Sequence, residues 1–425
     1  MRTFFFYTIL LLPFLSHSQD LSIQQLWNNL DKNLLYQQDE LQMAIRKAEL
    51  QEQKSNRIPV FYIDANLQRN LIIPTTPVPA IAFDPNAADG AIIPLKFSTK
   101  WSSRAGVQFE WSLFDPKRKS EELQKSLAIE QTQIDQAQNI QNWKRDATLA
   151  YTAVVLATHQ YALAQADSAA YEHIRQIAKA RYEAGRESLT TYLLAEQEVE
   201  RKRINLYQAW SVLQEADLEL RLYVDLGKTQ TLSSDIGNIQ EFVKNHHVQN
   251  LTVQSLEKDQ QIIALQKTSI QKQRLPTIAL NGYIGQQYFS NEFRLDRSEE
   301  WFGNSFINLV FRVPLSAYFT SQASLRKTEL NYDLTAKKME QQRLNDEVSG
   351  KQSNAKMIAA ELKIKSYKKI EQLALQAKKE KEAAYHAGRI LLSAYNESIA
   401  AHNKALQDVW QSEYDLIKII MDRMI

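Results

Sequence analysis

The sequence predicts a mainly α-helical fold with a β-barrel contribution, built from a duplicated unit of long coiled-coil helices and two β-hairpins. Glycine and proline number only ten each in 425 residues, so most of the chain lacks the residues that interrupt helices. The pattern Y-x-A-G-R-x-x-L-x-x-Y occurs at 182–192 and again at 385–395. A pattern repeated within one chain indicates a repeated structural unit.

Residues 1–18 have the composition of a signal peptide. Arg2 precedes an apolar run from 4 to 15, and Ser16 and Ser18 follow in the arrangement that signal peptidase cleaves. The run is too short to span a membrane as a helix. We predict export with cleavage near Ser18; a buried N-terminal core helix is the alternative.

The composition excludes several classes of function. Charged residues make up 24% of the chain with a net charge of +2, which provides no basic surface for nucleic acid. Cysteine is absent, which removes disulfides, thiol chemistry and a lipid anchor on an N-terminal cysteine. No stretch after residue 20 approaches the roughly twenty apolar residues of a transmembrane helix. Insertion into a membrane would therefore require β-strands.

Two repeats are predicted, at 19–225 and 251–425, separated by a linker or equatorial segment at 226–250. Each repeat consists of a helix, a β-hairpin and a long helical hairpin. No proline lies between Pro116 and Pro276, so a helix can run from about 116 to 183, on the order of 100 Å. Asp115 is placed to cap it. Its coiled-coil seam steps by threes and fours through Ala147, Ala150, Val154, Ala157, Tyr161, Ala164, Ser168 and Tyr171.

Gly185 and Gly388 are predicted to be equivalent tips of the two helical hairpins. Glycine adopts the left-handed conformation that ends a helix without steric cost. After each tip, one side of the return helix repeats every seven residues, as expected for a supercoil. The first column is Tyr192, Val199, Leu206, Leu213 and Leu220, and the second is Tyr395, His402, Val409 and Leu416.

The β-hairpins are predicted at about 60–114 and 277–315. Their strands alternate apolar and polar residues, as in "VFYIDANLQRN", "AGVQFEWSL", "TIALNGYIG" and "INLVFRVPL". The apolar sides comprise Phe61, Ile63, Ala65 and Leu67; Ala105, Val107, Phe109, Trp111 and Leu113; Ile278, Leu280 and Ile284; and Ile307, Leu309, Phe311, Val313 and Leu315. The proline-rich loop between the first two strands is expected to be exposed and irregular.

The strand pattern is compatible with an outer-membrane barrel, although soluble two-layer sheets alternate in the same way. Aromatic residues cluster near the strand ends, as a membrane-interface belt requires. Four strands cannot close a barrel, and an open edge cannot lie in hydrocarbon, so several copies must share one barrel. Two copies would supply eight strands and three would supply twelve. The predicted membrane-interface aromatics are Trp101, Trp111, Tyr288 and Trp301.

Over nearly the whole mature chain, the sequence resembles the TolC-type outer-membrane efflux proteins. The resemblance rests on "NRIPVFYIDANLQ" and "QRLPTIALNGYIG" at the helix-to-strand entries, on "VQFEWSLFDPKRKSEE" at the strand-to-helix exit and on "RYEAGRESLTTYLLAEQEVERKRINLYQA" across the first tip. It implies a homotrimer with a twelve-stranded barrel in the outer membrane and an α-barrel tunnel through the periplasm. The implied partners are a periplasmic adaptor protein, an inner-membrane transporter and outer-membrane lipid.

The resemblance also implies roles for the tips. It places the adaptor-docking grooves at Ala184, Gly185, Arg186, Ala387, Gly388 and Arg389. The family's periplasmic aperture uses a tyrosine just ahead of the second tip glycine, which Tyr385 matches. Thr191 and Ala394 stand where acidic residues are expected, which argues against an aspartate ring. A constriction would then use Thr190, Thr191 and Tyr385. The alternative is that the tip glycines and tyrosines have a purely structural role in forming the turns.

No catalytic, cofactor or metal site is predicted. The chain lacks G-x-S-x-G, a P-loop and a G-x-G-x-x-G after a strand. The adjacent His246 and His247 have no further ligands at metal-binding spacing and are expected to be a solvated pair in the linker. A passive conduit is therefore favoured, as the exit duct of a tripartite efflux pump or a type I secretion system. An exported coiled-coil scaffold without a pore is the alternative.

Overall fold

A computed structural model describes residues 21–224, 232–246 and 251–423. The predicted signal peptide lies outside the described residues. The chain folds as two compact units. The sheet unit comprises residues 43–132 and 256–338, and the helical unit comprises the described residues up to 42, 133–255 and from 339 onward.

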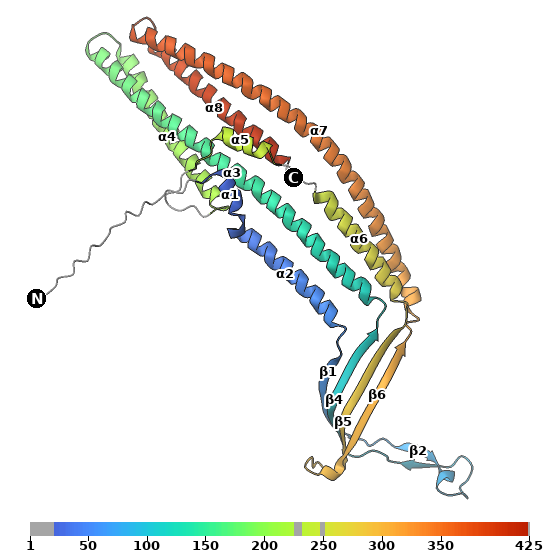
Figure 1. Cartoon of the computed structure of the whole chain (residues 1–425). Coiled ribbons are helices and arrows are strands. Elements are labelled where there is room, and N and C mark those ends of the chain that lie inside the picture. Colours follow the sequence, from blue (N-terminus) through green and yellow to red (C-terminus); the bar gives the residue numbers. More distant parts are fainter. Residues whose placement is uncertain (1–20, 225–231, 247–250, 424–425) are drawn as a thin grey trace, which may run out of the picture. The chain divides into compact units, whose positions relative to one another are not determined.

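The sheet unit contains four antiparallel strands that lie side by side in Figure 1. Their order is β1-β4-β5-β6, so each predicted hairpin is a pair of neighbours and the two hairpins join through β4 and β5. The edges of the sheet are β1 and β6. The strands are β1 (Val60–Arg69), β4 (Trp101–Phe114), β5 (Thr277–Ser290) and β6 (Trp301–Arg312).

The strand register confirms that each strand has one apolar and one polar side. Phe61 pairs with Phe109, which pairs with Gly282 and through it with Ile307. Residues directly opposite each other share a face, so the predicted apolar residues of all four strands lie on one face of the sheet. Large side chains on that face, such as Ile63 and Ile307, are exposed in the single chain.

The strand ends differ from the prediction in three places. The register shifts between Ser112 and Phe114, so Phe114 rather than Leu113 continues the apolar face opposite Ile278. β6 begins earlier than predicted, at Trp301, and ends at Arg312. It stops before Pro314, which has no backbone N–H for the ladder, so Val313 and Leu315 lie outside the strand.

The loop between β1 and β4 is not irregular, contrary to the expectation from its prolines. It forms a two-stranded sheet of β2 (Thr76–Pro79) and β3 (Ile92–Leu95), with a short 3₁₀ helix at Ala80–Ala82. Pro77 lies opposite Pro94 in this pair. A two-stranded sheet tolerates proline because each strand has a free edge.

The long helices begin and end close to the predicted positions. Asp115 accepts a hydrogen bond from the Lys117 amide at 3.1 Å, which caps the entry to α3 (Arg118–Glu183). α4 (Leu189–Leu220) returns beside α3, and α8 (Leu392–Asp422) returns beside α7 (Ala317–His386), as Figure 1 shows. α2 (Leu34–Ser55) and α6 (Leu251–Lys272) precede β1 and β5.

The core of the helical unit lies between α1 (Ile23–Asn28), α3, α5 (Ile236–Lys244) and α8. The Tyr151 hydroxyl donates to the Leu21 carbonyl at 2.7 Å and accepts from the Ser234 amide at 3.0 Å. The Trp27 indole donates to Thr148. Part of the predicted polar linker thus folds as α5, whose apolar side chains Ile236, Ile239 and Val243 are buried.

Candidate functional site

The two predicted tips have the same backbone geometry. Gly185 and Gly388 both have φ of +70°. At the first tip the Arg186 amide bonds to the Arg181 carbonyl at 2.8 Å, and at the second the Arg389 amide bonds to the Ala384 carbonyl at 2.9 Å. This is the hydrogen bond of a Schellman motif, which satisfies carbonyls at a helix C-terminus. The glycine signal in the sequence therefore identified both turns.

The two tyrosines of each repeated pattern stack across the turn. The Tyr182 and Tyr192 rings are 5.9 Å apart at an interplanar angle of 8°, and the Tyr385 and Tyr395 rings are 5.3 Å apart at 16°. The environments differ, because Tyr182 is exposed whereas Tyr385 is 1% exposed. The stacking accounts for the spacing of the tyrosines in both patterns. It does not explain why the second pair is buried and the first is not.

Arg181 joins the two tips of one chain. Its guanidinium lies 4.9 Å from the centre of the Tyr385 ring and 3.5 Å from the Glu187 carboxylate. Burial raises the pKa of the Tyr385 hydroxyl, and burial together with Glu382 raises the pKa of the Tyr395 hydroxyl to about 12. Sequence reasoning missed Arg181, because the residue at the equivalent place in the second pattern is Ala384 and the repeat gave no signal for it.

The other predicted tip residues are exposed. Ala184, Gly185 and Arg186 are exposed at the first tip, as are Ala387, Gly388 and Arg389 at the second. Within the described part of the chain, no ion pair neutralises Arg186 or Arg389. Both tips therefore present an uncompensated guanidinium beside a glycine turn.

The three predicted aperture residues are in different environments. Thr190 is exposed, and the Thr191 hydroxyl lies 3.0 Å from the Ser188 hydroxyl at the start of α4. Tyr385 packs with Tyr171, Ala178, Ala195 and Tyr395 in a cluster that includes residues of all four long helices. Nearby, Lys202 of α4 pairs with Asp167 of α3 at 2.8 Å and lies over the Tyr171 ring. The side chains of this ion pair are only 14% and 12% exposed. The pair therefore links the two helices of the first hairpin where little water is present.

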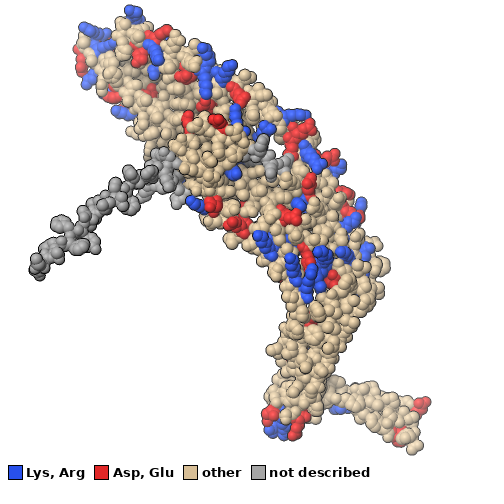
Figure 2. All heavy atoms as spheres, in the orientation of Figure 1, with Lys and Arg blue, Asp and Glu red and all other residues tan. Residues whose placement is uncertain are grey.

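The polar face of the sheet carries all the charged residues of the strand interiors. Asp64 pairs with Arg104, and the Tyr62 hydroxyl donates to Glu110 at 2.9 Å. The opposite face carries none, and in Figure 2 the surface over the strands is almost uniformly free of Lys, Arg, Asp and Glu. One face suited to lipid and one suited to water is the arrangement of an outer-membrane strand.

Glycines bring the central strands into close packing on both faces. On the polar face, the Tyr283 ring lies over Gly106 and Gly285, which pair with each other. A Cβ on Gly106 would come within 2.6 Å of the Ile284 carbonyl oxygen. On the apolar face, the Phe109 ring occupies the space above Gly282. Aromatic rings cover glycines in this way in other curved sheets.

The predicted interface aromatics lie at both ends of the strands. Trp111 lies at the end next to the helices, where its indole donates to the Arg57 carbonyl at 2.8 Å. Trp101 and Trp301 lie at the opposite end, where the Trp301 indole bonds to the Leu295 carbonyl. Tyr288 is fully buried, and its hydroxyl bonds to the Glu292 carbonyl and the Arg294 amide, so it anchors the β5–β6 loop.

The described residues contain no group of three His, Asp or Glu placed to hold a metal ion. Of the predicted histidine pair, His246 packs against Trp27 and Phe242, and His247 lies outside the described residues. No helix among the described segments is long and apolar enough to cross a membrane.

Comparisons with known proteins identify the class. The model of the outer membrane efflux protein family matches residues 30–224. No curated protein matches the chain by sequence. The CmeC outer membrane channel of Campylobacter jejuni has a similar fold, with a TM-score of 0.74 at 14% identity over 95% of this chain and 84% of that one.

Two further solved structures agree. VceC, an outer membrane protein of Vibrio cholerae, has a TM-score of 0.69 at 12% identity over 95% of both chains. The open state of the MtrE outer membrane channel of Neisseria gonorrhoeae has a TM-score of 0.70 at 14% identity over 95% of this chain and 88% of that one. The family match and the shared fold confirm the recognition of a TolC-type outer-membrane efflux protein. Residues 30–224 therefore match the outer membrane efflux protein family, and the chain as a whole has the fold of solved outer-membrane channels.

Proposed function

We propose that the chain forms a homotrimer that serves as the exit duct of a tripartite efflux pump or a type I secretion system. Cargo would pass through it passively from the periplasm to the exterior, and an inner-membrane transporter would supply the energy. The observation that carries the proposal is a four-stranded sheet with one apolar face and two open edges. In hydrocarbon those edges require partners, because unpaired backbone groups cost several kcal/mol each.

Three copies offer the most economical closure. If β6 of one copy pairs with β1 of the next, three copies give a closed barrel of twelve strands. The polar faces, with Asp64, Arg104 and Glu110, would then surround the lumen, and the apolar faces would contact lipid. An eight-stranded barrel from two copies would fill its interior with side chains and leave no duct.

The tips are the proposed contact with a periplasmic adaptor. Ala184, Gly185 and Arg186 with Ala387, Gly388 and Arg389 would form its docking grooves. Two features support this assignment: the residues are exposed, and both arginines lack an ion-pair partner among the described residues. An adaptor with carboxylates at the contact surface would form ion pairs with both arginines.

The aperture is proposed to depend on Thr190, Thr191 and Tyr385, with Arg181 as a further element. The contact of Arg181 with Tyr385 holds the tip of α7 against the tip of α3. Loss of the Tyr385 ring would remove both this contact and the stacking on Tyr395. The two tips of each chain would then be free to separate.

The proposal is tested by the mass of the detergent-extracted protein and by single-channel conductance in a planar bilayer. A trimer with small, resolvable conductance is expected, and the Tyr385→Ala, Thr191→Ala double variant should conduct more. Tyr182→Ala is the matched control, because Tyr182 is the exposed equivalent at the first tip and should leave the conductance unchanged. A soluble monomer or dimer that never inserts would exclude a channel and leave the exported scaffold.

A further inference from the structure

The helix ends that adjoin the sheet carry a large excess of basic residues. β1 and β5 start and β4 and β6 end at the same end of the sheet, as the pairs Val60–Glu110, Phe114–Ile278 and Thr277–Arg312 establish. We call the adjoining segments 43–59, 115–126, 266–276 and 312–328 the collar. The collar contains fourteen Lys or Arg and five Asp or Glu. In Figure 2, Lys and Arg side chains gather over these helix ends, next to the uncharged surface of the strands.

The opposite end of the sheet lacks this excess. The loop segments 69–100 and 291–300 contain five Lys or Arg and six Asp or Glu. Each strand interior between the two ends is uncharged on its apolar face. The basic charge is therefore confined to the end of the sheet from which the helices leave.

The collar begins where the apolar face ends. Trp111 belongs to that face, and its indole N–H bonds to the carbonyl of Arg57 in the collar. In the adjoining collar segments, the side chains of Ile58, Leu315 and Phe319 are exposed. Tryptophan with its apolar ring on one side and a polar partner on the other is typical of the depth at which lipid headgroups begin.

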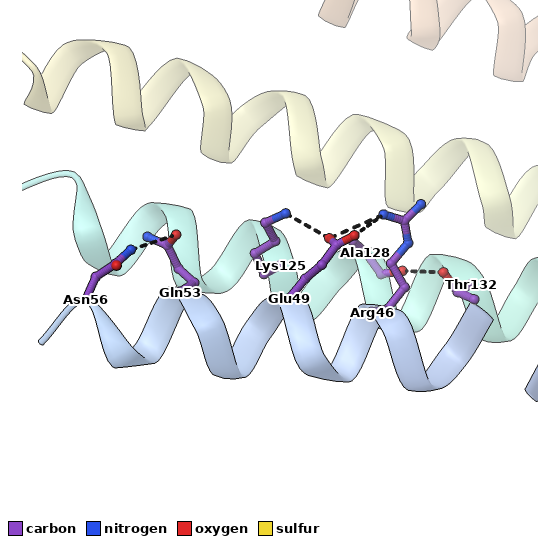
Figure 3. A network of polar contacts seen from close by, with 7 residues as sticks. All are labelled: Arg46, Glu49, Gln53, Asn56, Lys125, Ala128 and Thr132. Carbon is purple, nitrogen blue, oxygen red and sulfur yellow. Dashed lines mark hydrogen bonds and ion pairs between the residues drawn. The ribbon is translucent and has the colours of Figure 1, made fainter. Parts of the chain in front are cut away.

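Some collar cations are already neutralised within the chain. Figure 3 shows Arg46 and Lys125 converging on the Glu49 carboxylate, which holds the pKa of Glu49 below its ordinary value, mainly through the hydrogen bond from Lys125. Arg57 pairs with Glu122 in the same way. In contrast, Lys54, Lys119 and Lys327 are exposed and have no ion pair with any residue in the described ranges.

The position of some of these cations is unfavourable for the fold itself. Lys117, Arg118 and Lys119 lie at the N-terminus of α3, where the helix dipole disfavours positive charge. Lys117 is paired with Glu121, and Arg118 bonds to the Ser112 carbonyl. Lys119 forms no ion pair in the described structure, so an external anion would stabilise it.

We propose that the collar binds the headgroups of anionic phospholipids in the membrane leaflet on the side of the helices. The proposal rests on the sheet lying in a membrane, as in the proposed function. The phosphate groups would accept hydrogen bonds from Lys54, Lys119 and Lys327, while the acyl chains lie against the apolar face. Basic residues next to a spanning segment attract anionic lipids in this way.

The test is native mass spectrometry of the delipidated protein in detergent, titrated with dioleoyl phosphatidylglycerol or dioleoyl phosphatidylcholine. Phosphatidylglycerol should bind more tightly, and its advantage should fall as salt is raised. The Lys54→Gln, Lys119→Gln, Lys327→Gln variant should weaken phosphatidylglycerol binding by roughly 10- to 100-fold and leave phosphatidylcholine binding unchanged.

The matched control removes three cations from the other end of the sheet, with Arg69→Gln, Lys96→Gln and Lys100→Gln. It should bind phosphatidylglycerol as the unaltered protein does. Equal affinity for the two lipids, or equal losses in both variants, would overturn the proposal. Tighter binding of lipid A than of phosphatidylglycerol, with both weakened to the same degree in the collar variant, would overturn it as well. Flotation of the protein with vesicles is measured alongside, because failure to float would instead contradict the membrane location.

Discussion

At the scale of single residues, the sequence predicted what depends on local backbone chemistry. Gly185 and Gly388 were identifiable because few other residues adopt a positive φ at a helix end. The contact between Arg181 and Tyr385 was not predictable, because it joins two hairpins distant in sequence and only one pattern contains the arginine. A repeat identifies what two units share, and this contact is a place where they differ.

Substitution of a tip glycine should destabilise the protein for conformational reasons alone. A Cβ on Gly388 would meet no atom within 4 Å, so Gly388→Ala tests the cost of φ at +70° without a steric clash. We expect a loss of about 1–2 kcal/mol in the free energy of unfolding. Thermal unfolding followed by circular dichroism measures it.

Gly350 provides the matched control, because it lies inside α7 and a Cβ there also meets nothing within 4 Å. Gly350→Ala should stabilise the protein by about 0.5–1 kcal/mol, since alanine favours a helix interior. Equal effects of the two substitutions would mean that the left-handed turn at Gly388 is not required.

At the scale of elements, the period of the apolar residues predicted whether a segment is a helix or a strand more accurately than it predicted where the segment begins and ends. Strands of period two and a helix from about 116 to 183 are present. The bulge near Leu113, the β2–β3 pair and helix α5 were missed. The bulge and the pair depend on which strands lie opposite each other, and α5 was hidden because its three apolar residues stand among polar ones that suggested a linker.

The close pairing of β4 with β5 should depend on Gly106. A Cβ at this position would collide with the backbone of β5, which cannot move aside without breaking the ladder. Gly106→Ala should therefore reduce the fraction of protein recovered as an oligomer, measured by mass in detergent. Gly237→Ala in α5 is the control, since α5 is no part of the sheet and a Cβ there meets nothing within 4 Å, so the oligomer fraction should not change. An unaltered oligomer fraction for Gly106→Ala would show that β5 can yield.

At the scale of the whole molecule, the sequence predicted that one copy cannot complete the sheet. Four strands with edges at β1 and β6 are what the structure contains. The number of copies could not be obtained from residue patterns, because eight and twelve strands satisfy the same alternation. That number is set by strand tilt and stagger between copies, which no single chain encodes locally.

The proposed pairing of β6 with the next copy's β1 can be tested by cross-linking, since the chain has no cysteine of its own. Cysteines introduced together at Ile63 on β1 and at one of several β6 positions, such as Ser305 or Ile307, should give covalent dimers and trimers on oxidation. A cysteine at Val107 on the inner strand β4 replaces that at Ile63 in the control and should give none. Cross-links that form equally with Val107 would contradict edge pairing.

The two open edges also mean that maturation would depend on encounters between copies of the chain. In the proposed trimer, one copy cannot complete its sheet by intramolecular folding, so the last step would be a collision between copies whose rate rises with their concentration. Until that step, each copy exposes a template for strand addition and an apolar surface, and both also favour aggregation. The yield of the proposed duct would then depend on the relative rates of assembly and aggregation, and a periplasmic chaperone that shields β1 or β6 would favour assembly.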